Sequence, residues 1–187
     1  MMTDKLIALW EGTLEGSERD YAALHANLYP KLFVFASRIL NDDELVDDLL
    51  QDLFIKFWET REKIGKIRYV EAYFYRSTRS IALNHIRLVR HREAKLTLIP
   101  QSEPVFSAED IIVSRESDSL IKQQLVQILN SLPTKQREIL IMRFYDDLSY
   151  PQIAKILKIR YQSVINHVYR AIQKLRAVSE LSTFYAA

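Results

Sequence analysis

The residues best suited to reading nucleic acid lie near the C-terminus of the 187-residue chain. Four amide and aromatic side chains there recur at i, i+4, i+7 and i+11, on one side of a helix: Gln162, Asn166, Tyr169 and Gln173. No carboxylate interrupts this row, and three cations flank it: Arg170, Lys174 and Arg176. Amides can pair bidentately with adenine in the major groove, and cations can bind phosphates. The row therefore predicts contact with duplex DNA.

A pair of helices is needed to position this row. Ser149 and Gln152 have capping-box spacing, which predicts the start of a short helix. A turn at 158–160 follows, and a second helix is expected from 161 to about 176, with an inward side of Val164, Val168, Ala171 and Leu175. Lys158 sits where such turns favour glycine, so a positive φ there costs on the order of 1 kcal/mol. The pattern is that of a helix-turn-helix, with an ordinary helical hairpin as the alternative.

A second candidate for nucleic-acid binding is the cationic segment 69–92. Five of its side chains fall within an arc of about 80° on a helix: Arg76, Arg79, Leu83, Arg87 and Arg90. Three rings stand at its start: Tyr69, Tyr73 and Tyr75. The opposite side is expected in the core: Val70, Phe74, Ile81, His85 and Leu88. Cations suit a phosphate backbone, and rings beside arginines suit stacking on single-stranded bases. A membrane-surface helix and a solvated face with core tyrosines are the alternatives.

The segment 41–60 carries the opposite charge. Asn41 and Glu44 have capping-box spacing, which predicts a helix that is capped by Asn41 and runs to about Thr60. Eight apolar residues form a broad core stripe: Leu45, Val46, Leu49, Leu50, Leu53, Phe54, Phe57 and Trp58. The rest of the surface is polar: Asp47, Asp48, Gln51 and Asp52. This surface fits a docking site for a basic partner helix, a solvated face or, less well, a magnesium site.

Helical periodicity runs through almost the whole chain, which predicts an all-α protein. Residues 1–92 and 119–187 are expected to form two small helical domains, the second a helix-turn-helix domain. Between them, residues 93–118 are acidic and aperiodic, and we interpret them as a flexible linker. The net charge is zero in the first domain, −4 in the linker and +6 in the second domain. This distribution favours nucleic acid as a partner of the second domain.

Composition excludes several classes of protein. The absence of cysteine removes disulfides, zinc–thiolate sites and iron–sulfur clusters, and it fits a reducing cytosol. Three glycines are too few and too scattered for a phosphate-binding loop. Neither a membrane span nor a signal peptide is expected. The histidines lie at scattered positions: His25, His85, His91 and His167. Because no acid–base–nucleophile spacing accompanies them, we expect no catalytic residue, metal or cofactor.

Three motifs in order resemble those of the extracytoplasmic-function (ECF) sigma factors, small specificity subunits of bacterial RNA polymerase. Residues 47–58 read DDLLQDLFIKFW and are similar to the family's core-polymerase-binding helix. Residues 72–87 read AYFYRSTRSIALNHIR and are similar to the helix that contacts the −10 promoter element. Residues 132–157 read LPTKQREILIMRFYDDLSYPQIAKIL and resemble the start of the domain that reads the −35 element.

The resemblance implies roles for individual residues. Those implied to dock on the clamp helices of the polymerase's largest subunit are Asp48, Leu49, Gln51 and Asp52. Phe54 and Trp58 lie on the same helix. They either belong to this docking surface or are core residues. The stretch 63–69 corresponds to the family's loop that captures a flipped base of the melted strand. Residues implied to bind the −10 element are Lys63, Lys66, Arg68, Tyr69, Tyr73, Arg76, Arg79 and Arg87. Those implied to bind the −35 element are Gln162, Ser163, Asn166, Tyr169, Arg170 and Lys174.

The resemblance also implies partners and a place of action. The chain is expected to bind core RNA polymerase and promoter DNA, to direct promoter recognition and melting, and to pair with an anti-sigma factor. It is expected in the bacterial cytoplasm at the nucleoid, without membrane insertion. In the family the linker threads the polymerase cleft, where a net charge of −4 would imitate nucleic acid. The alternative is a stand-alone helix-turn-helix regulator that binds duplex DNA without polymerase, which leaves residues 41–92 without a role.

Overall fold

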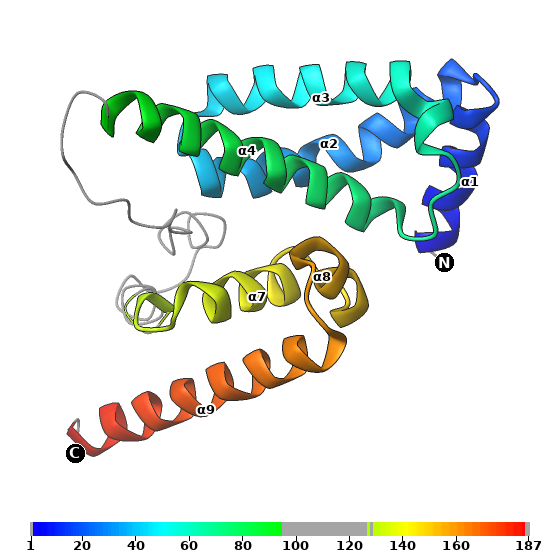
Figure 1. The fold of residues 1–187 in the computed structure, drawn as a ribbon. Helices are drawn as coiled ribbons and strands as arrows, with labels where there is room; N and C mark the ends of the chain where they lie inside the picture. Colours follow the sequence, from blue (N-terminus) through cyan, green and yellow to red (C-terminus); the bar gives the residue numbers. More distant parts are fainter. Residues whose placement is uncertain (1, 95–126, 128, 186–187) are drawn as a thin grey trace. The chain divides into compact units, whose positions relative to one another are not determined.

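The structure is a computed structural model that describes residues 2–94, 127 and 129–185. Within these ranges every regular element is an α-helix, which confirms the predicted all-α class. The chain divides into two compact units, residues 1–104 and 105–187 (Figure 1). The predicted linker at 93–118 lies almost entirely outside the described residues, although the helix before it continues to residue 94.

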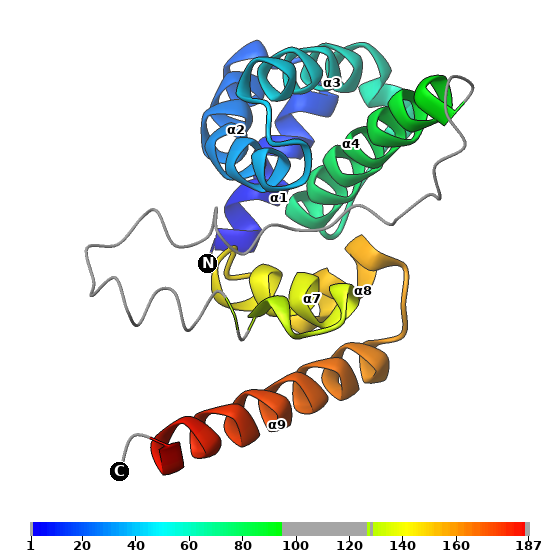
Figure 2. The same ribbon diagram turned by 90° about the vertical axis from the view of Figure 1, so that its left-hand side faces the viewer.

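The first unit consists of α1 (Met2–Leu14), α2 (Glu18–Leu40), α3 (Asp43–Ile64) and α4 (Val70–Ala94). α2 contacts the three other helices, and α1 stands at the end of the bundle where α3 connects to α4 (Figures 1 and 2). Its core comes largely from α2 and α3, whose buried residues recur every three or four positions: Leu24, Leu28, Leu32, Phe35, Val46, Leu50, Leu53, Phe54 and Phe57. Burial of these stripes holds the bundle together, at roughly 25 cal/mol per Å² of apolar surface.

The connection between α2 and α3 differs from the prediction. Asn41 does not cap α3; it ends α2 in the left-handed conformation (φ 53°), and its backbone N–H donates to Ser37 O at 2.8 Å. Asp42 is the N-cap instead, because its extended backbone lets the carboxylate accept from Leu45 N at 3.0 Å. The predicted cap is therefore wrong by one residue, since a two-residue connection leaves Asn41 to the preceding helix. α3 also continues past its predicted end.

The second unit consists of α7 (Thr134–Phe144), α8 (Tyr150–Leu157) and α9 (Tyr161–Tyr185). α9 contacts both α7 and α8 (Figure 2). One cation of this unit is buried: the Arg137 guanidinium donates to the backbone oxygens of Leu129 (3.0 Å), Asn130 (2.9 Å) and Leu132 (3.3 Å). Arg137 therefore stabilises the chain before α7 and does not contribute to the positive surface that the net charge indicates.

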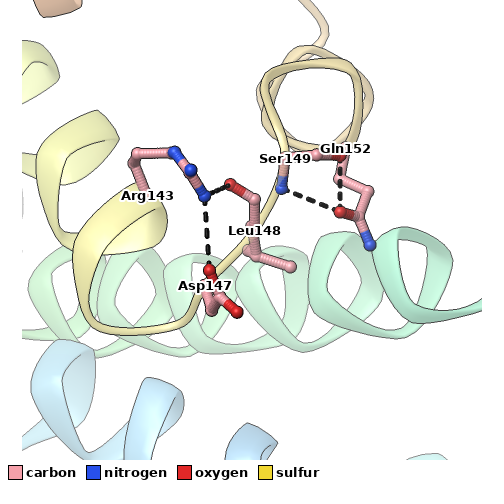
Figure 3. A network of polar contacts seen from close by, with 5 residues as sticks. All are labelled: Arg143, Asp147, Leu148, Ser149 and Gln152. Carbon is pink, nitrogen blue, oxygen red and sulfur yellow. Dashed lines mark hydrogen bonds and ion pairs between the residues drawn. The ribbon is translucent and has the colours of Figure 1, made fainter. Parts of the chain in front are cut away.

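A polar network joins the end of α7 to the start of α8 (Figure 3). Gln152 Oε1 accepts from the backbone N–H of Ser149 at 2.8 Å and from its Oγ at 2.6 Å, which confirms the predicted capping box. Asp147 takes the left-handed conformation (φ 50°), and its carboxylate accepts from Arg143 Nη1 at 3.3 Å. The same guanidinium donates to Leu148 O at 3.4 Å. These contacts fix the turn from which α8 departs.

The turn between α8 and α9 is the one that the sequence predicts. Lys158 is left-handed (φ 53°), and its backbone N–H donates to Ala154 O. Ile159 N bonds to the same oxygen at 3.1 Å. α9 then begins at Tyr161 and continues to Tyr185, nine residues beyond its predicted end. The two helices and their turn therefore form the predicted helix-turn-helix.

Candidate nucleic-acid and partner interfaces

The outer side of α9 carries most of the residues predicted for the −35 element. Five of the six are exposed: Gln162, Asn166, Tyr169, Arg170 and Lys174. Ser163 is half-buried. Gln162 Nε2 donates to Asn166 Oδ1 at 3.2 Å, so the two amides adjoin on the helix surface. The other side of α9 is buried: Val164, Val168 and Ala171. Because these apolar residues pack toward the core of the unit, the amide row must face outward.

The residues predicted for the −10 element lie in the last turn of α3, on the connection that follows it and on α4. Five are exposed: Lys63, Lys66, Arg68, Arg76 and Arg87. Three are half-buried: Tyr69, Tyr73 and Arg79. The exposed side of α4 is rotated from the predicted arc, because Leu83 within that arc is half-buried. This exposed side includes Arg76, Ser80, Asn84, Arg87, Leu88 and His91. It carries no carboxylate, so it suits a phosphate backbone.

Two predictions for α4 are wrong. Tyr75 is fully buried and packs edge-on against Phe35, with ring centroids 5.0 Å apart, so it cannot stack on a base. Leu88, predicted for the core side, is 60% exposed. Val70 lies on the same side of the helix and is buried. The side of a helix on which a residue lies therefore does not by itself decide whether that residue is buried. Burial also depends on which other helices pack against each end of the helix.

The connection between α3 and α4 presents cations beside a ring. Gly65 ends α3 with φ 66° and ψ −158°. The Lys66 side chain is 85% exposed, and its Nζ lies 3.8 Å from Glu11 Oε1 of α1. The Arg68 guanidinium carbon lies 5.7 Å from the centre of the Tyr69 ring. A half-buried ring with neighbouring cations still offers an edge for a single-stranded base and charges for its phosphate.

The sequence did not predict the contact that Trp10 makes with the α3–α4 connection. Trp10 in α1 is fully buried, and its Nε1 donates to Gly65 O at 2.9 Å. The two residues are separated by 55 positions, so no local pattern could pair them. The indole could be recognised only as a core residue.

α3 presents a polar face that matches the predicted docking surface. Asp48, Gln51 and Asp52 are exposed, and Leu49 is half-buried. Phe54 is a core residue. Trp58 is half-buried, and the Arg61 guanidinium carbon lies 4.2 Å from the centre of its ring. The face therefore offers carboxylates with a partly accessible leucine between them.

Asp47 differs from its neighbours on α3. It is half-buried and accepts hydrogen bonds from the Tyr29 hydroxyl of α2 and from Gln51 Nε2, the latter at 2.8 Å. Burial, followed by the hydrogen bond to Asp47 and its charge, raises the pKa of Tyr29 to about 12. Asp47 thus joins α3 to α2, whereas the sequence placed it with the exposed carboxylates.

A groove of about 510 Å³ runs between α3 and α4. Its walls include Leu49 and Asp52 from the acidic face, and Tyr73 and Ser80 from α4. The candidate docking face and the candidate DNA-binding side therefore share an edge within the first unit. Among the residues that the structure describes, no three side chains of the metal-ligating kinds gather together. No helix in the described ranges is long and apolar enough to cross a bilayer.

Comparison with known proteins decides the family. The family profile for sigma-70 region 2 matches residues 24–92, and that for sigma-70 region 4 matches residues 122–175. The RNA polymerase sigma factor NccH of Alcaligenes xylosoxydans xylosoxydans is 30% identical over 149 residues, which span 73% of this chain and 74% of that protein. The ECF RNA polymerase sigma factor SigW of Bacillus subtilis is 24% identical over 156 residues, 78% and 81% of the two chains. This chain belongs to the ECF sigma factors.

The sigma factor therefore directs transcription initiation, which confirms the function that the sequence predicts. Sigma factors are in general DNA-binding regulators of RNA polymerase rather than enzymes. The region 2 match covers most of α2, all of α3 and α4 up to residue 92. The region 4 match covers α7, α8 and α9 up to residue 175. The alternative of a helix-turn-helix regulator that binds duplex DNA without polymerase gave the first unit no role, and we do not retain it.

Solved structures show the same fold as this sigma factor. CnrH, solved in complex with the cytosolic domain of CnrY, superposes with a TM-score of 0.61 at 22% identity, covering 95% of this chain and 99% of that chain. The sigma factor RpoE, solved with the anti-sigma factor NepR from Bartonella quintana, gives 0.63 at 23% identity, covering 87% and 98%.

Proposed function

We propose that the two units of this sigma factor divide the work at a promoter. The first, predicted as residues 1–92, binds core polymerase and then recognises and melts the −10 element. The second, predicted as residues 119–187, recognises the −35 element. The observation that carries this division is the segregation of exposed side chains: carboxylates on α3, cations on the α3–α4 connection and α4, and amides with cations on α9.

The acidic face of α3 is the proposed contact with core polymerase. Asp48 and Asp52 lie beyond the first turn of the helix, where the helix dipole gives carboxylates no advantage. They are also four residues apart, so they repel each other by about 0.2–0.5 kcal/mol. A basic partner, the clamp helices of the largest subunit, would attract both carboxylates and so offset their mutual repulsion. Leu49 and Gln51 complete the proposed contact.

Melting of the −10 element is assigned to the α3–α4 connection and to α4. Flipping a base out of the duplex costs a few kcal/mol of unstacking and unpairing, which contacts with the opened strand must offset. Tyr69 and Tyr73 are the proposed rings near that strand. The proposed phosphate contacts are cationic: Lys63, Lys66, Arg68, Arg76, Arg79 and Arg87.

Recognition of the −35 element is assigned to α9, the second helix of the helix-turn-helix. In such motifs the N-terminal residues of the second helix reach base edges in the major groove. Gln162, Ser163 and Asn166 occupy that part of α9, and Tyr169 follows on the same side. Arg170 and Lys174 lie farther along and are proposed to bind phosphates.

An anti-sigma factor is the third proposed partner. The solved relatives with this fold were in complex with the cytosolic domain of CnrY and with the anti-sigma factor NepR. We infer that the present chain also has such a partner. It requires no catalytic residue, metal or cofactor of its own, and it is proposed to act in the bacterial cytoplasm on nucleoid DNA.

Charge reversal on α3 tests the proposed contact with polymerase. The variant Asp48→Lys/Asp52→Lys should bind core polymerase on the order of tenfold more weakly or worse, because like charges brought together at an interface cost several kcal/mol. Fluorescence anisotropy with labelled sigma factor and purified core polymerase measures this affinity.

The control is Glu15→Lys/Glu62→Lys, which changes the net charge equally at two other exposed positions of the first unit. Its affinity for core polymerase should equal that of the wild type. The proposal fails if the Asp48→Lys/Asp52→Lys variant also binds core polymerase as the wild type does.

A further inference from the structure

Trp10 connects the N-terminal helix to the α3–α4 connection. Its indole Nε1 donates to Gly65 O at 2.9 Å, and its ring meets the Phe74 ring edge-on, with centroids 6.0 Å apart and planes at 83°. Trp10 is fully buried, so packing in the first unit fixes where this donor points. The sigma-70 region 2 match begins at residue 24, so α1 lies outside it.

Gly65 is held from both sides. Its backbone N–H donates to Arg61 O at 3.0 Å within α3, and its carbonyl accepts from Trp10. The N–H belongs to the peptide unit before Gly65 and the carbonyl to the peptide unit after it, so both planes are oriented. Gly65 has φ 66° and ψ −158°, a conformation open essentially to glycine alone. Two hydrogen bonds therefore set the direction in which the chain leaves α3.

The chain that leaves α3 in this direction forms the proposed base-capture loop. Lys66 follows the anchored carbonyl directly, and Arg68 and Tyr69 come next. Glu11 of α1 also approaches Lys66 at 3.8 Å. Both side chains of this pair are well exposed, so the pair adds little to the anchoring. The hydrogen bond from the buried Trp10 indole to the half-buried Gly65 is the contact that matters.

We propose that Trp10 is a positioning residue for promoter melting, which holds the base-capture loop in place through Gly65. This inference rests on the proposed function of residues 63–69. A loop that is already ordered loses less conformational freedom when it takes up a base, so more of its binding free energy is left to offset the cost of unstacking. Through Trp10, α1 is part of the proposed melting apparatus.

The test is Trp10→Phe in the full chain, assembled with core polymerase. Phenylalanine keeps a buried ring and removes the donor. A promoter with 2-aminopurine at the first melted position of the −10 element reports opening as a rise in fluorescence. Loss of one hydrogen bond predicts opening that is slower by about two- to tenfold. The deficit should disappear on a promoter whose −10 element is already unpaired by mismatches, because the two strands there are open before the loop engages them.

The matched control is Tyr21→Phe. The Tyr21 hydroxyl donates to Phe54 O within α3, so this variant also removes one bond from a ring to a backbone carbonyl, but away from the loop. It should open promoters at the wild-type rate. Both variants should bind core polymerase as the wild type does.

The loop itself is tested in parallel with Lys66→Ala/Arg68→Ala, which keeps the inference separate from the proposed function. Slow opening by this loop variant together with wild-type opening by Trp10→Phe would overturn the role of Trp10 alone. Wild-type opening by both would overturn the proposed function of the loop, and the inference with it. A Trp10→Phe deficit that persists on the mismatched promoter would also overturn the inference, since general destabilisation would then explain it.

Discussion

Neighbouring residues of α9 are expected to contribute to promoter binding in different ways. Asn166 is exposed in the first half of the helix, with its amide next to that of Gln162 at 3.2 Å. Arg170 is one turn farther along and also exposed. An amide that pairs with a base edge discriminates between sequences, whereas a guanidinium on a phosphate binds all sequences alike.

Asn166→Ala is therefore expected to cost about 1–3 kcal/mol at the matching −35 sequence and to relax specificity at one position. Arg170→Ala should weaken binding to all sequences similarly and reduce its salt dependence. Holoenzyme binding to a set of −35 variants, measured at two salt concentrations, separates these effects.

Asn27→Ala is the control for both variants. Asn27 is an exposed amide on α2, where its Nδ2 donates to Ala23 O at 2.6 Å, and no proposed contact includes it. Its promoter binding should be that of the wild type. Unchanged −35 preference in Asn166→Ala would show that this amide does not read the sequence.

At the scale of elements, the turn of the helix-turn-helix contains strain that a single substitution can relieve. Lys158 has φ 53°, where the Cβ of any residue other than glycine is unfavourable. Lys158→Gly should stabilise the second unit by about 0.5–1 kcal/mol, because relief of strain exceeds the added freedom of glycine in the unfolded chain. Urea denaturation of the full chain measures this change.

Lys155→Gly provides the matched comparison within the same helix. Lys155 is exposed in the last turn of α8 but still has helical backbone, where glycine costs up to about 1 kcal/mol relative to a good helix former. The two variants change the net charge equally and should change stability in opposite directions. Destabilisation by both would show that the left-handed turn at Lys158 carries no strain.

At the scale of the whole molecule, two half-buried histidines link stability to pH. Burial lowers the pKa of His25, whose ring lies 4.8 Å from that of Tyr29 and 4.4 Å from that of Phe54. Burial, followed by the charges of Lys135 and Arg170, lowers the pKa of His167. In each case the unfolded chain takes up a proton at a higher pH than the folded unit does.

Both units should therefore have their full stability above about pH 6.5, the ordinary pKa of histidine, and lose stability as the pH falls below it. Calorimetry of the full chain between about pH 8 and pH 5 measures this loss. His167→Gln should reduce the loss in the second unit only, and His25→Gln in the first unit only. His91→Gln, at an exposed position of α4, should change neither. Unaltered pH dependence in both His25→Gln and His167→Gln would contradict the assignment.

The sequence determined the helices, the helix-turn-helix with its turn at 158–160, and the outward amide row of α9. These features depend on hydrophobic periodicity and on caps formed between residues three or four positions apart, such as Ser149 and Gln152. Because such interactions are local, they can be recognised from the spacing of residues in the sequence.

Only the tertiary structure decided which parts of each helix are covered. It buried Tyr75 and Val70, left Leu88 exposed, moved the cap of α3 from Asn41 to its neighbour, and joined Trp10 to a glycine far along the chain. Periodicity identifies one side of one helix, but burial and long-range hydrogen bonds depend on which other helices pack against it and where they end.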